Sequence, residues 1–317
     1  MKKLNKTWLI HIFSIAAVGL YAWVIQHYYG WQKILLAWHE VSPLKLVLCL
    51  ALMFFTYAVR AARIHDFFSP SPDYPLASCL KIMLTHNLLN NLMPMRTGEA
   101  SFPLLMRREF GTPLASATAL LVLFRIMDFQ ILMVLGCLCF LMFSSAHTWQ
   151  LWVMPVLILA PLALFPLKKY LQQLAPKFVG YKFEQKFVQV LDILPSNFFT
   201  LLRMWLLSWL SWGTKLVVFT FIMLWFADVD WWSAMGATFA GELGSIIPIH
   251  SPGGLGTYEA SMLGISAMLG LRGDWILFAG VQLHLLIIFS TLLSGVVGYF
   301  IPSRGGVKAG SSSTELL

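Results

Sequence analysis

The chain has 317 residues, of which 58% are hydrophobic and only 11% are charged. Soluble domains carry about 25% charged residues, so this composition indicates an integral membrane protein and leaves little of the chain for a soluble catalytic domain. The formal net charge is +8, but the basic residues are scattered over short loops and form no stripe, which argues against a nucleic-acid partner. Lysine and arginine spread in this way are typical of loops on the cytoplasmic side of a membrane.

Apolar runs along the chain are long enough to cross about 30 Å of hydrocarbon as helices. They cover residues 8–26, 44–60, 113–144, 149–167, 201–226 and 275–301, and they predict an all-α polytopic membrane protein with a single transmembrane domain over residues 1–302. Residues 168–200 are predicted to be a cytoplasmic amphipathic loop that contains an amphipathic helix lying on the membrane surface, and a plain solvated loop is the alternative. The Gly/Ser-rich residues 303–317 are predicted to be a disordered cytoplasmic tail.

Two further apolar stretches are interrupted by residues that break helices. Residues 76–110 are broken at Pro94 and Gly98, and residues 231–271 are broken at Pro248 and over residues 252–256. Lipid cannot satisfy the backbone groups that such breaks free, so each break must be buried in protein or line a watery cavity. We therefore predict two re-entrant hairpins with polar turns, the first elbow (residues 94–101) and the second elbow (residues 248–261), and full crossing is the alternative.

The distribution of basic residues predicts how these hairpins are oriented. If both stretches are hairpins, most of the lysines and arginines fall on the cytoplasmic side with both chain termini, including Arg60, Arg63, Arg107 and Arg108. The two hairpins then enter from opposite faces. Both elbows contain a proline, any residue and a basic residue, followed by Thr and Gly in either order and by Glu-Ala-Ser. In the second elbow a Ser-Pro-Gly-Gly-Leu insertion follows His250, and Tyr258 precedes the glutamate. Similar broken segments entering from opposite faces are what an inverted repeat produces.

Polar and ionisable residues gather around the first elbow. Asn87, Asn90 and Asn91 share one helical face, where their amides can bond a headgroup or the broken backbone, or else join helices. Arg96 and Glu99 lie in the elbow itself.

Arg125 and Asp128 follow in the next span, and each ionisable residue deep in a span costs roughly 2.5–3.5 kcal/mol. Such residues either form ion pairs that hold the bundle together or form a charged pocket. In such a pocket arginine would grip a phosphate and the carboxylates would hold the arginines, or bind a proton or cation.

The second elbow offers a different set of groups. Glu242 lies before it, and His250 and Glu259 lie within it. The glycine-rich turn containing Gly253 and Gly254 is predicted to leave backbone N–H groups free to bind an anion. The turn has neither the Walker spacing nor the dinucleotide-binding fingerprint, so nucleotide binding is not expected.

The remaining polar residues carry weaker signals. His86 and His284 stand alone on apolar faces and are interpreted as structural, while Lys215 is open between snorkelling and cavity lining. The four cysteines lie in apolar segments without metal or disulfide spacing. No cofactor and no metal site are predicted.

The order of these motifs resembles the lysylphosphatidylglycerol synthase/flippase transmembrane-domain family over essentially the whole chain. The residues that carry the resemblance are Asn91, Pro94, Arg96, Gly98, Glu99, Arg108, Gly111, Arg125, Asp128, Pro248, Pro252, Gly253, Gly254, Gly256 and Glu259. Tyr258 stands where the family commonly has arginine, which weakens anion binding at the second elbow. The full-length synthases also append a soluble aminoacyl transferase domain, and no segment of this sequence is long or polar enough to form one. The resemblance therefore implies a flippase-like domain, and lysyl transfer is not expected.

Together, the residues and the resemblance predict a lipid flippase in a bacterial cytoplasmic membrane, and not an enzyme. Its substrate would be a membrane lipid with an anionic or lipid-linked headgroup. A homo-oligomer or a lipid-synthesis complex would be compatible with this function. The alternative is a membrane enzyme or accessory subunit that acts on a lipid-linked substrate, with Glu99 or Asp128 as general base.

Overall fold

The structure, a computed structural model, describes residues 6–68, 72–143, 149–178, 190–191, 193–246 and 251–302. Within these ranges the chain forms helices and no strand, which confirms the predicted all-α fold. The helices are α1 (Lys6–Tyr28), α2 (Trp31–Ala37), α3 (Pro43–Phe67), α4 (Leu76–Leu92), α5 (Ser101–Phe110), α6 (Leu114–Phe143), α7 (Trp149–Leu159), α8 (Leu164–Phe178), α10 (Phe198–Phe226), α11 (Trp231–Ile246), α12 (Thr257–Met268) and α13 (Asp274–Phe300). Short 3-10 turns lie between them: η1 (Trp38–Glu40), η2 (Pro94–Ala100), η3 (Ala160–Ala163) and η4 (Pro252–Gly254).

Several helices are long and apolar enough to cross a membrane. In the described part of the chain these are α3, α6, the stretch from α7 through α8, α10 and α13, and α1 occupies the first predicted span with 23 residues. The predicted ends differ at two places. Helix α3 continues to Phe67, and the helical stretch after residue 167 continues to Phe178, so the predicted cytoplasmic loop begins as helix. Residues 179–189 of that loop and the predicted tail lie outside the described residues.

Arg60 and Arg63 explain why the second predicted span ends too early. The sequence analysis placed both arginines in a cytoplasmic loop, but the structure places them inside α3. Arg63 is 4% exposed. A charged residue is tolerated inside a helical bundle where it has a partner of opposite charge, and the partner comes from a distant part of the chain.

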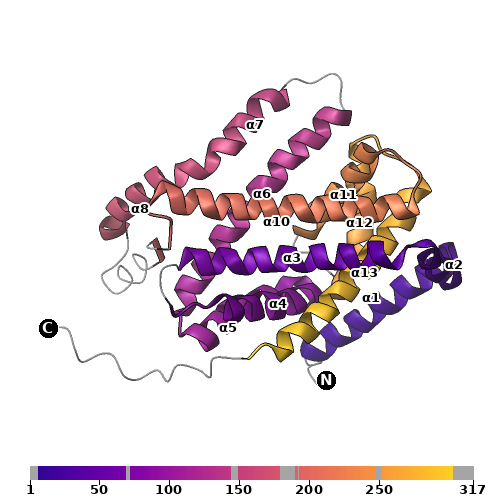
Figure 1. Ribbon diagram of the computed structural model, residues 1–317, viewed down its shortest axis with the longest axis horizontal. Helices are drawn as coiled ribbons and strands as arrows, with labels where there is room; N and C mark the ends of the chain where they lie inside the picture. The colour runs from indigo at the N-terminus through magenta and orange to yellow at the C-terminus, as the bar shows by residue number, and fades with distance from the viewer. Residues whose placement is uncertain are drawn as a thin grey trace, which may run out of the picture.

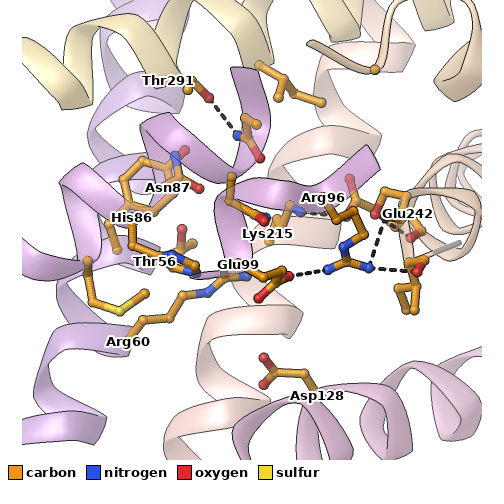
Figure 2. Close-up of a pocket in the computed structure, with 18 of the residues that line it drawn as sticks. Thr56, Arg60, His86, Asn87, Arg96, Glu99, Asp128, Lys215, Glu242 and Thr291 are labelled. Atoms are coloured by element: carbon orange, nitrogen blue, oxygen red, sulfur yellow. Dashed lines mark hydrogen bonds and ion pairs between the residues drawn. The ribbon is translucent and has the colours of Figure 1, made fainter. Parts of the chain in front are cut away.

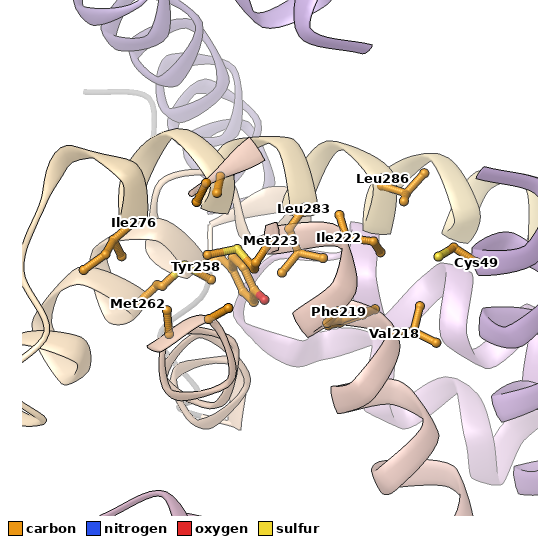
Figure 3. Close-up of a cluster of buried hydrophobic side chains, with 14 of the residues drawn as sticks. Cys49, Val218, Phe219, Ile222, Met223, Tyr258, Met262, Ile276, Leu283 and Leu286 are labelled. Carbon is orange, nitrogen blue, oxygen red and sulfur yellow. The ribbon is translucent and has the colours of Figure 1, made fainter. Parts of the chain in front are cut away.

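Apolar side chains pack in two main clusters inside the bundle. One cluster joins α3 and α10 to α11, α12 and α13, and Figure 3 shows Tyr258 and Met262 of α12 near Leu283 of α13 in it. The other cluster joins α3 and α10 to α4, α5 and α6. Large apolar side chains also cover the outer surface, as expected for helices that face lipid, for example Trp152 and Tyr299.

Each interrupted stretch packs against itself. Helix α4 contacts α5, and α11 contacts α12. At the first elbow, a Cβ on Gly98 would lie 2.3 Å from the Leu89 carbonyl oxygen and 2.4 Å from Asn90 Cα. In the second stretch, a Cβ on Gly244 would meet the side chain of Ser261. Glycine at these positions therefore lets the two arms of each stretch approach closely.

The first arm of each broken stretch packs against the long helix that follows the other broken stretch. Figure 1 shows α3 and α10 side by side, with α4 and α5 beside α3 and with α11 and α12 near the other end of α10. Helix α4 of the first interrupted stretch packs on α13, and α11 of the second packs on α6. The turns η2 and η4 contact each other. The two broken stretches are thus held together at the middle of the bundle.

Candidate functional site

A polar cavity of about 430 Å³ lies where the two elbows meet. Its walls come from α3, α4, α6, α10, α11 and α13 together with both turns. Figure 2 shows Arg96 and Glu99 joined within it, with Arg60, His86 and Asn87 on one side. Of the residues predicted from the sequence, those that line the cavity are Asn87, Asn90, Asn91, Arg96, Glu99, Arg125, Asp128, Glu242, Gly253 and Gly254. Glu259 lies directly behind His284 of the cavity wall, and His250 lies outside the described residues.

Glu99 organises the first elbow by binding two arginines. Its Oε1 atom lies 2.6 Å from Arg96 Nη2 and 2.7 Å from Arg125 Nη2. Arg96 also donates to the backbone carbonyl oxygen of Ile246, at 2.6 Å, and thereby reaches the C-terminal end of α11. Carbonyls at a helix C-terminus attract cations, so Arg96 links the first elbow electrostatically to the second broken stretch.

The backbone of the first elbow is strained where it directs Arg96. Met95 and Arg96 have φ angles of 53° and 54°, a left-handed conformation that is rare outside glycine. Such residues cost about 1–3 kcal/mol each and persist where the surrounding structure holds them. The bonds that Arg96 makes to Glu99 and to Ile246 are the contacts that hold this conformation.

Asp128 pairs with Arg63 of α3. The distance from Asp128 Oδ1 to Arg63 Nη1 is 2.6 Å, and the two side chains are only 8% and 5% exposed. Ser208 accepts a second bond from Arg63, and the guanidinium lies 4.0 Å from the ring centroid of Phe124. Arg125, three residues before Asp128, is instead paired with Glu99.

Lys215 lines the cavity, which resolves the two interpretations left open by the sequence. Its ammonium lies 2.5 Å from Glu242 Oε2, and the Glu242 side chain is only 2% exposed. Trp212 and Phe219 flank the ammonium at 4.9 Å and 5.1 Å from their ring centroids. The pair joins α10 to α11 inside the bundle.

The sequence left open whether the three asparagines join helices or bind a headgroup, and the structure shows both arrangements. Asn91 donates to the Thr291 hydroxyl at 2.8 Å and so joins α4 to α13. Asn87 Nδ2 and Asn90 Oδ1 are buried and have no hydrogen-bond partner among the described residues. Buried polar atoms are rarely left unbonded, so these two amides are available to a polar molecule in the cavity.

The second elbow is organised around Glu259, whose carboxylate accepts several bonds. Oε1 accepts from the Tyr21 hydroxyl at 2.9 Å and lies 2.7 Å from His284 Nδ1. Oε2 accepts from the backbone N–H of Gly256 at 2.9 Å and so caps the start of α12. His284 Nε2 lies 2.9 Å from the carbonyl oxygen of Gly253.

The glycine-rich turn does not present the free N–H groups that the sequence analysis predicted. The N–H of Gly254 donates to the Ser251 carbonyl, that of Leu255 donates to the Pro252 carbonyl, and that of Gly256 is taken by Glu259. The predicted anion-binding concavity is therefore wrong for these groups. These three N–H groups already have acceptors within the second elbow, and the turn directs the carbonyl oxygen of Gly253 toward His284.

Arg60 and His284 are cavity residues whose importance the sequence analysis missed. Arg60 donates to Ser211 and lies over Trp212, and no carboxylate lies within ion-pair distance of it in the described part of the chain. Among the described residues that line the cavity, five cations face three carboxylates, which leaves two excess positive charges when the histidines are neutral: Arg60, Arg63, Arg96, Arg125 and Lys215 against Glu99, Asp128 and Glu242.

Helical spacing along α3 could have identified Arg60. It follows Thr56 and Tyr57 by four and three residues and precedes Arg63 by three, so these polar side chains share one face of the helix. No comparable local signal marks His284. Its partner Glu259 lies 25 residues earlier in the chain, on another helix.

An apolar helical bundle that encloses a charged cavity between two broken stretches defines a polytopic membrane protein with an internal polar site. The family model for the lysylphosphatidylglycerol synthase TM region matches residues 11–295, and the chain belongs to this family. The match confirms the resemblance drawn from the motif residues and indicates a multi-pass membrane protein involved in lipid handling. Comparisons with curated proteins and with solved structures found no match.

Proposed function

We propose that this protein is a lipid translocator that passes a headgroup through the charged cavity while the acyl chains stay in the surrounding lipid. The observation that carries the proposal is the cavity itself, a space of about 430 Å³ lined by ionisable side chains inside an apolar helical bundle. Such residues are costly within a membrane and typically mark the path of a polar substrate. The volume lies within the range of ligand pockets, roughly 300–1,000 Å³.

The excess positive charge favours an anionic headgroup. Glu99 is shared by two arginines, and Arg60 has no carboxylate at all within ion-pair distance in the described chain. A planar guanidinium binds phosphate through two parallel hydrogen bonds, and the amides of Asn87 and Asn90 offer further bonds. A phosphate-containing headgroup would therefore supply the missing negative charge and the missing hydrogen-bond partners together.

Residue spacing supports an inverted repeat as the framework of the translocator. Lys215 precedes Glu242 by 27 residues, and Arg60 precedes Asn87 by the same interval. In each case the first residue lies on a long helix, α10 or α3, and the second lies on the first arm of the following broken stretch. Lys215 and Glu242 bind each other, and Arg60 and Asn87 both line the cavity. The reciprocal packing of α4 on α13 and of α11 on α6 has the same two-fold character.

The segments that follow the two elbows show a second matching spacing. Arg125 follows Glu99 by 26 residues, and His284 follows Glu259 by 25 residues. In both cases a basic side chain on the long helix after the broken stretch binds the elbow glutamate. Two related broken stretches that enter the membrane from opposite faces would give the cavity equivalent routes to either side. The lysine and arginine distribution favours a bacterial cytoplasmic membrane topology with both termini in the cytoplasm.

Reconstitution in proteoliposomes tests the proposal. Purified protein would be inserted into vesicles that contain fluorescent phosphatidylglycerol or phosphatidylcholine, and the transbilayer movement of each would be followed by quenching from outside. We expect protein-dependent movement that favours the anionic lipid and slows at least tenfold in Arg60→Gln. Arg272→Gln, at an exposed loop position, is the matched control and should behave as the parent protein.

Mass spectrometry of the same vesicles separates the translocator from a membrane enzyme. A translocator changes only the sidedness of the lipid, whereas an enzyme changes its covalent structure. A chemically altered lipid would therefore replace the proposal with the enzyme alternative. Absence of movement with anionic, zwitterionic and isoprenoid-phosphate lipids alike would refute translocation.

A further inference from the structure

We infer that Glu259 and His284 form a proton-binding site that couples proton movement to translocation; the coupling rests on the function proposed above. The pair lies beside the cavity at the second elbow, and its side chains are only 4% and 5% exposed. His284 itself lines the cavity, so a proton in the cavity water can reach the imidazole.

Hydrogen bonding assigns the charge of Glu259. Every group within bonding distance of its carboxylate can donate: the Tyr21 hydroxyl, the Gly256 N–H and a ring nitrogen of His284. An ionised carboxylate can accept all three bonds at once, whereas a protonated carboxyl would require the Tyr21 hydroxyl or the His284 ring to act as the acceptor. Glu259 therefore carries a negative charge in this conformation.

Hydrogen bonding also assigns the charge of His284. Nδ1 faces the Glu259 carboxylate, and Nε2 faces the Gly253 carbonyl oxygen, so both ring nitrogens face acceptors. A neutral imidazole donates from one nitrogen only, and imidazolium donates from both. Two acceptors around one ring are the arrangement that an imidazolium satisfies with both of its N–H groups, and the proposal assigns this form to His284.

The surroundings leave Glu259 as the only charged group in direct contact with His284 in the described chain. Tyr258 of α12 stacks near the imidazole, with 4.7 Å between ring centroids, and Tyr21 of α1 reaches the pair through Glu259. The other ionisable groups that line the same cavity are Arg60 and Arg63 of α3, His86 of α4, Arg96 and Glu99 of the first elbow, Arg125 and Asp128 of α6, Lys215 of α10 and Glu242 of α11. Five cations and three carboxylates among these groups leave two excess positive charges in the part of the cavity that the described residues form.

The Glu99–Arg125 pair of the first broken stretch differs from the Glu259–His284 pair of the second in its basic partner. There, Glu99 binds Arg125, which stays charged at every physiological pH. At the corresponding position the second half has histidine, which gains or loses its charge near neutral pH. One half of the repeat thus has a permanent cation for the headgroup, and the other half has a titratable one for the proton.

Deprotonation of His284 changes the second elbow directly. The neutral ring keeps one N–H, which the Glu259 carboxylate attracts most strongly, and Nε2 then turns a lone pair toward the Gly253 carbonyl oxygen. The bond that fastens turn η4 to α13 becomes a repulsion. Turn η4 contacts turn η2, so a displacement of η4 would also disturb the part of the cavity wall that the first elbow forms. Proton loss and opening of the cavity are therefore linked events.

Nitrogen-15 NMR of histidine-labelled protein in detergent tests the proton site without any transport. The His284 signals would be identified as those missing from His284→Gln. We expect both ring nitrogens to carry protons in the parent protein near neutral pH, and only one to do so in Glu259→Gln. A ring that is neutral even at about pH 5, or that keeps both protons at about pH 9, overturns the proton site.

Transport measurements test the coupling. Lipid movement in proteoliposomes would be measured with and without an imposed pH gradient. We expect the gradient to accelerate movement in the parent protein and in His39→Gln, an exposed histidine outside the cavity. In His284→Gln and in His284→Arg, which mimics the permanent charge of Arg125, the ratio of the two rates should fall to unity.

The outcomes separate the inference from the function on which it rests. Lipid movement that responds to the gradient in His284→Gln as in the parent protein overturns proton coupling and leaves translocation intact. Lipid movement in the parent protein that never responds to a gradient does the same. No lipid movement in any protein overturns both.

Discussion

Replacement of Gly98 by alanine should open the first elbow and destabilise the protein. The added Cβ would lie 2.3 Å from the Leu89 carbonyl oxygen, 2.4 Å from Asn90 Cα and 2.5 Å from the Leu89 carbonyl carbon. Non-bonded carbon atoms rest about 3.5–4.0 Å apart, so the elbow and α4 must separate by about 1 Å or more. All three neighbours are backbone atoms, and no side chain can rotate away to make room.

The size of the effect follows from the packing. Inserting a methyl group into a filled site usually costs about 1–3 kcal/mol, and a site walled by backbone belongs at the upper end of that range. Asn90 also borders the cavity, so the same displacement should weaken headgroup binding. The measurement is the apparent melting temperature in detergent, followed by tryptophan fluorescence, together with the lipid translocation rate.

Gly264→Ala is the matched control for this substitution. Gly264 lies in α12, the second arm of the other broken stretch, and an added Cβ there has no atom within 4 Å. Alanine in a helix is favoured over glycine by roughly 0.5–1 kcal/mol, so the control should melt at the same temperature or higher. Equal melting temperatures for the two variants would refute the close packing of the first elbow against α4.

Three further predictions concern single interactions. Arg63→Met or Asp128→Leu alone leaves a buried charge unpaired and should destabilise the protein by about 3–5 kcal/mol, whereas the double variant should melt close to the parent temperature. Asn87→Leu removes a buried, unbonded amide and should raise the melting temperature while it slows translocation of anionic lipid. The Ser233 hydroxyl and the backbone N–H groups at the start of α11 lower the pKa of Asp230. Its capping contribution is therefore present above the unfolded pKa of about 3.9 and is lost as pH falls through the lower folded pKa. Asp230→Ala should accordingly lower the melting temperature at neutral pH, and the difference should shrink in acid.

The helices could be predicted from the sequence because the relevant signals are local. Apolar runs gave the positions of the long helices, and the helix breakers gave the positions of both elbows, at Pro94 and at residues 252–256. The end of α3 could not be predicted in this way. Arginine at positions 60 and 63 has the local signature of a loop, and only the carboxylate of Asp128 on another helix makes Arg63 an interior residue.

The composition of the site could be predicted better than its pairing. Most candidate residues line one cavity, because ionisable residues in apolar segments gather where they can be satisfied together. Arg125 and Asp128 lie three residues apart on α6, yet each binds a partner on another element, which no local pattern indicates. His284 was interpreted as structural because a lone histidine on an apolar face gives no sign of a glutamate 25 residues away.

The strained backbone at Arg96 connects the stability of the first elbow to the state of the second. The left-handed conformation of Met95 and Arg96 is unfavourable by itself, and the bonds from Arg96 to Glu99 and to the Ile246 carbonyl oxygen offset that cost. Any movement that separates α11 from the first elbow breaks the bond to Ile246, but it also lets the backbone relax. The backbone strain present in the closed state is released in the open state. The free-energy difference between the two states is therefore smaller than the loss of a charged hydrogen bond alone would give. The translocation proposed above requires two states of similar free energy, and an arginine held in a left-handed conformation between two broken helices would provide a local means of balancing them.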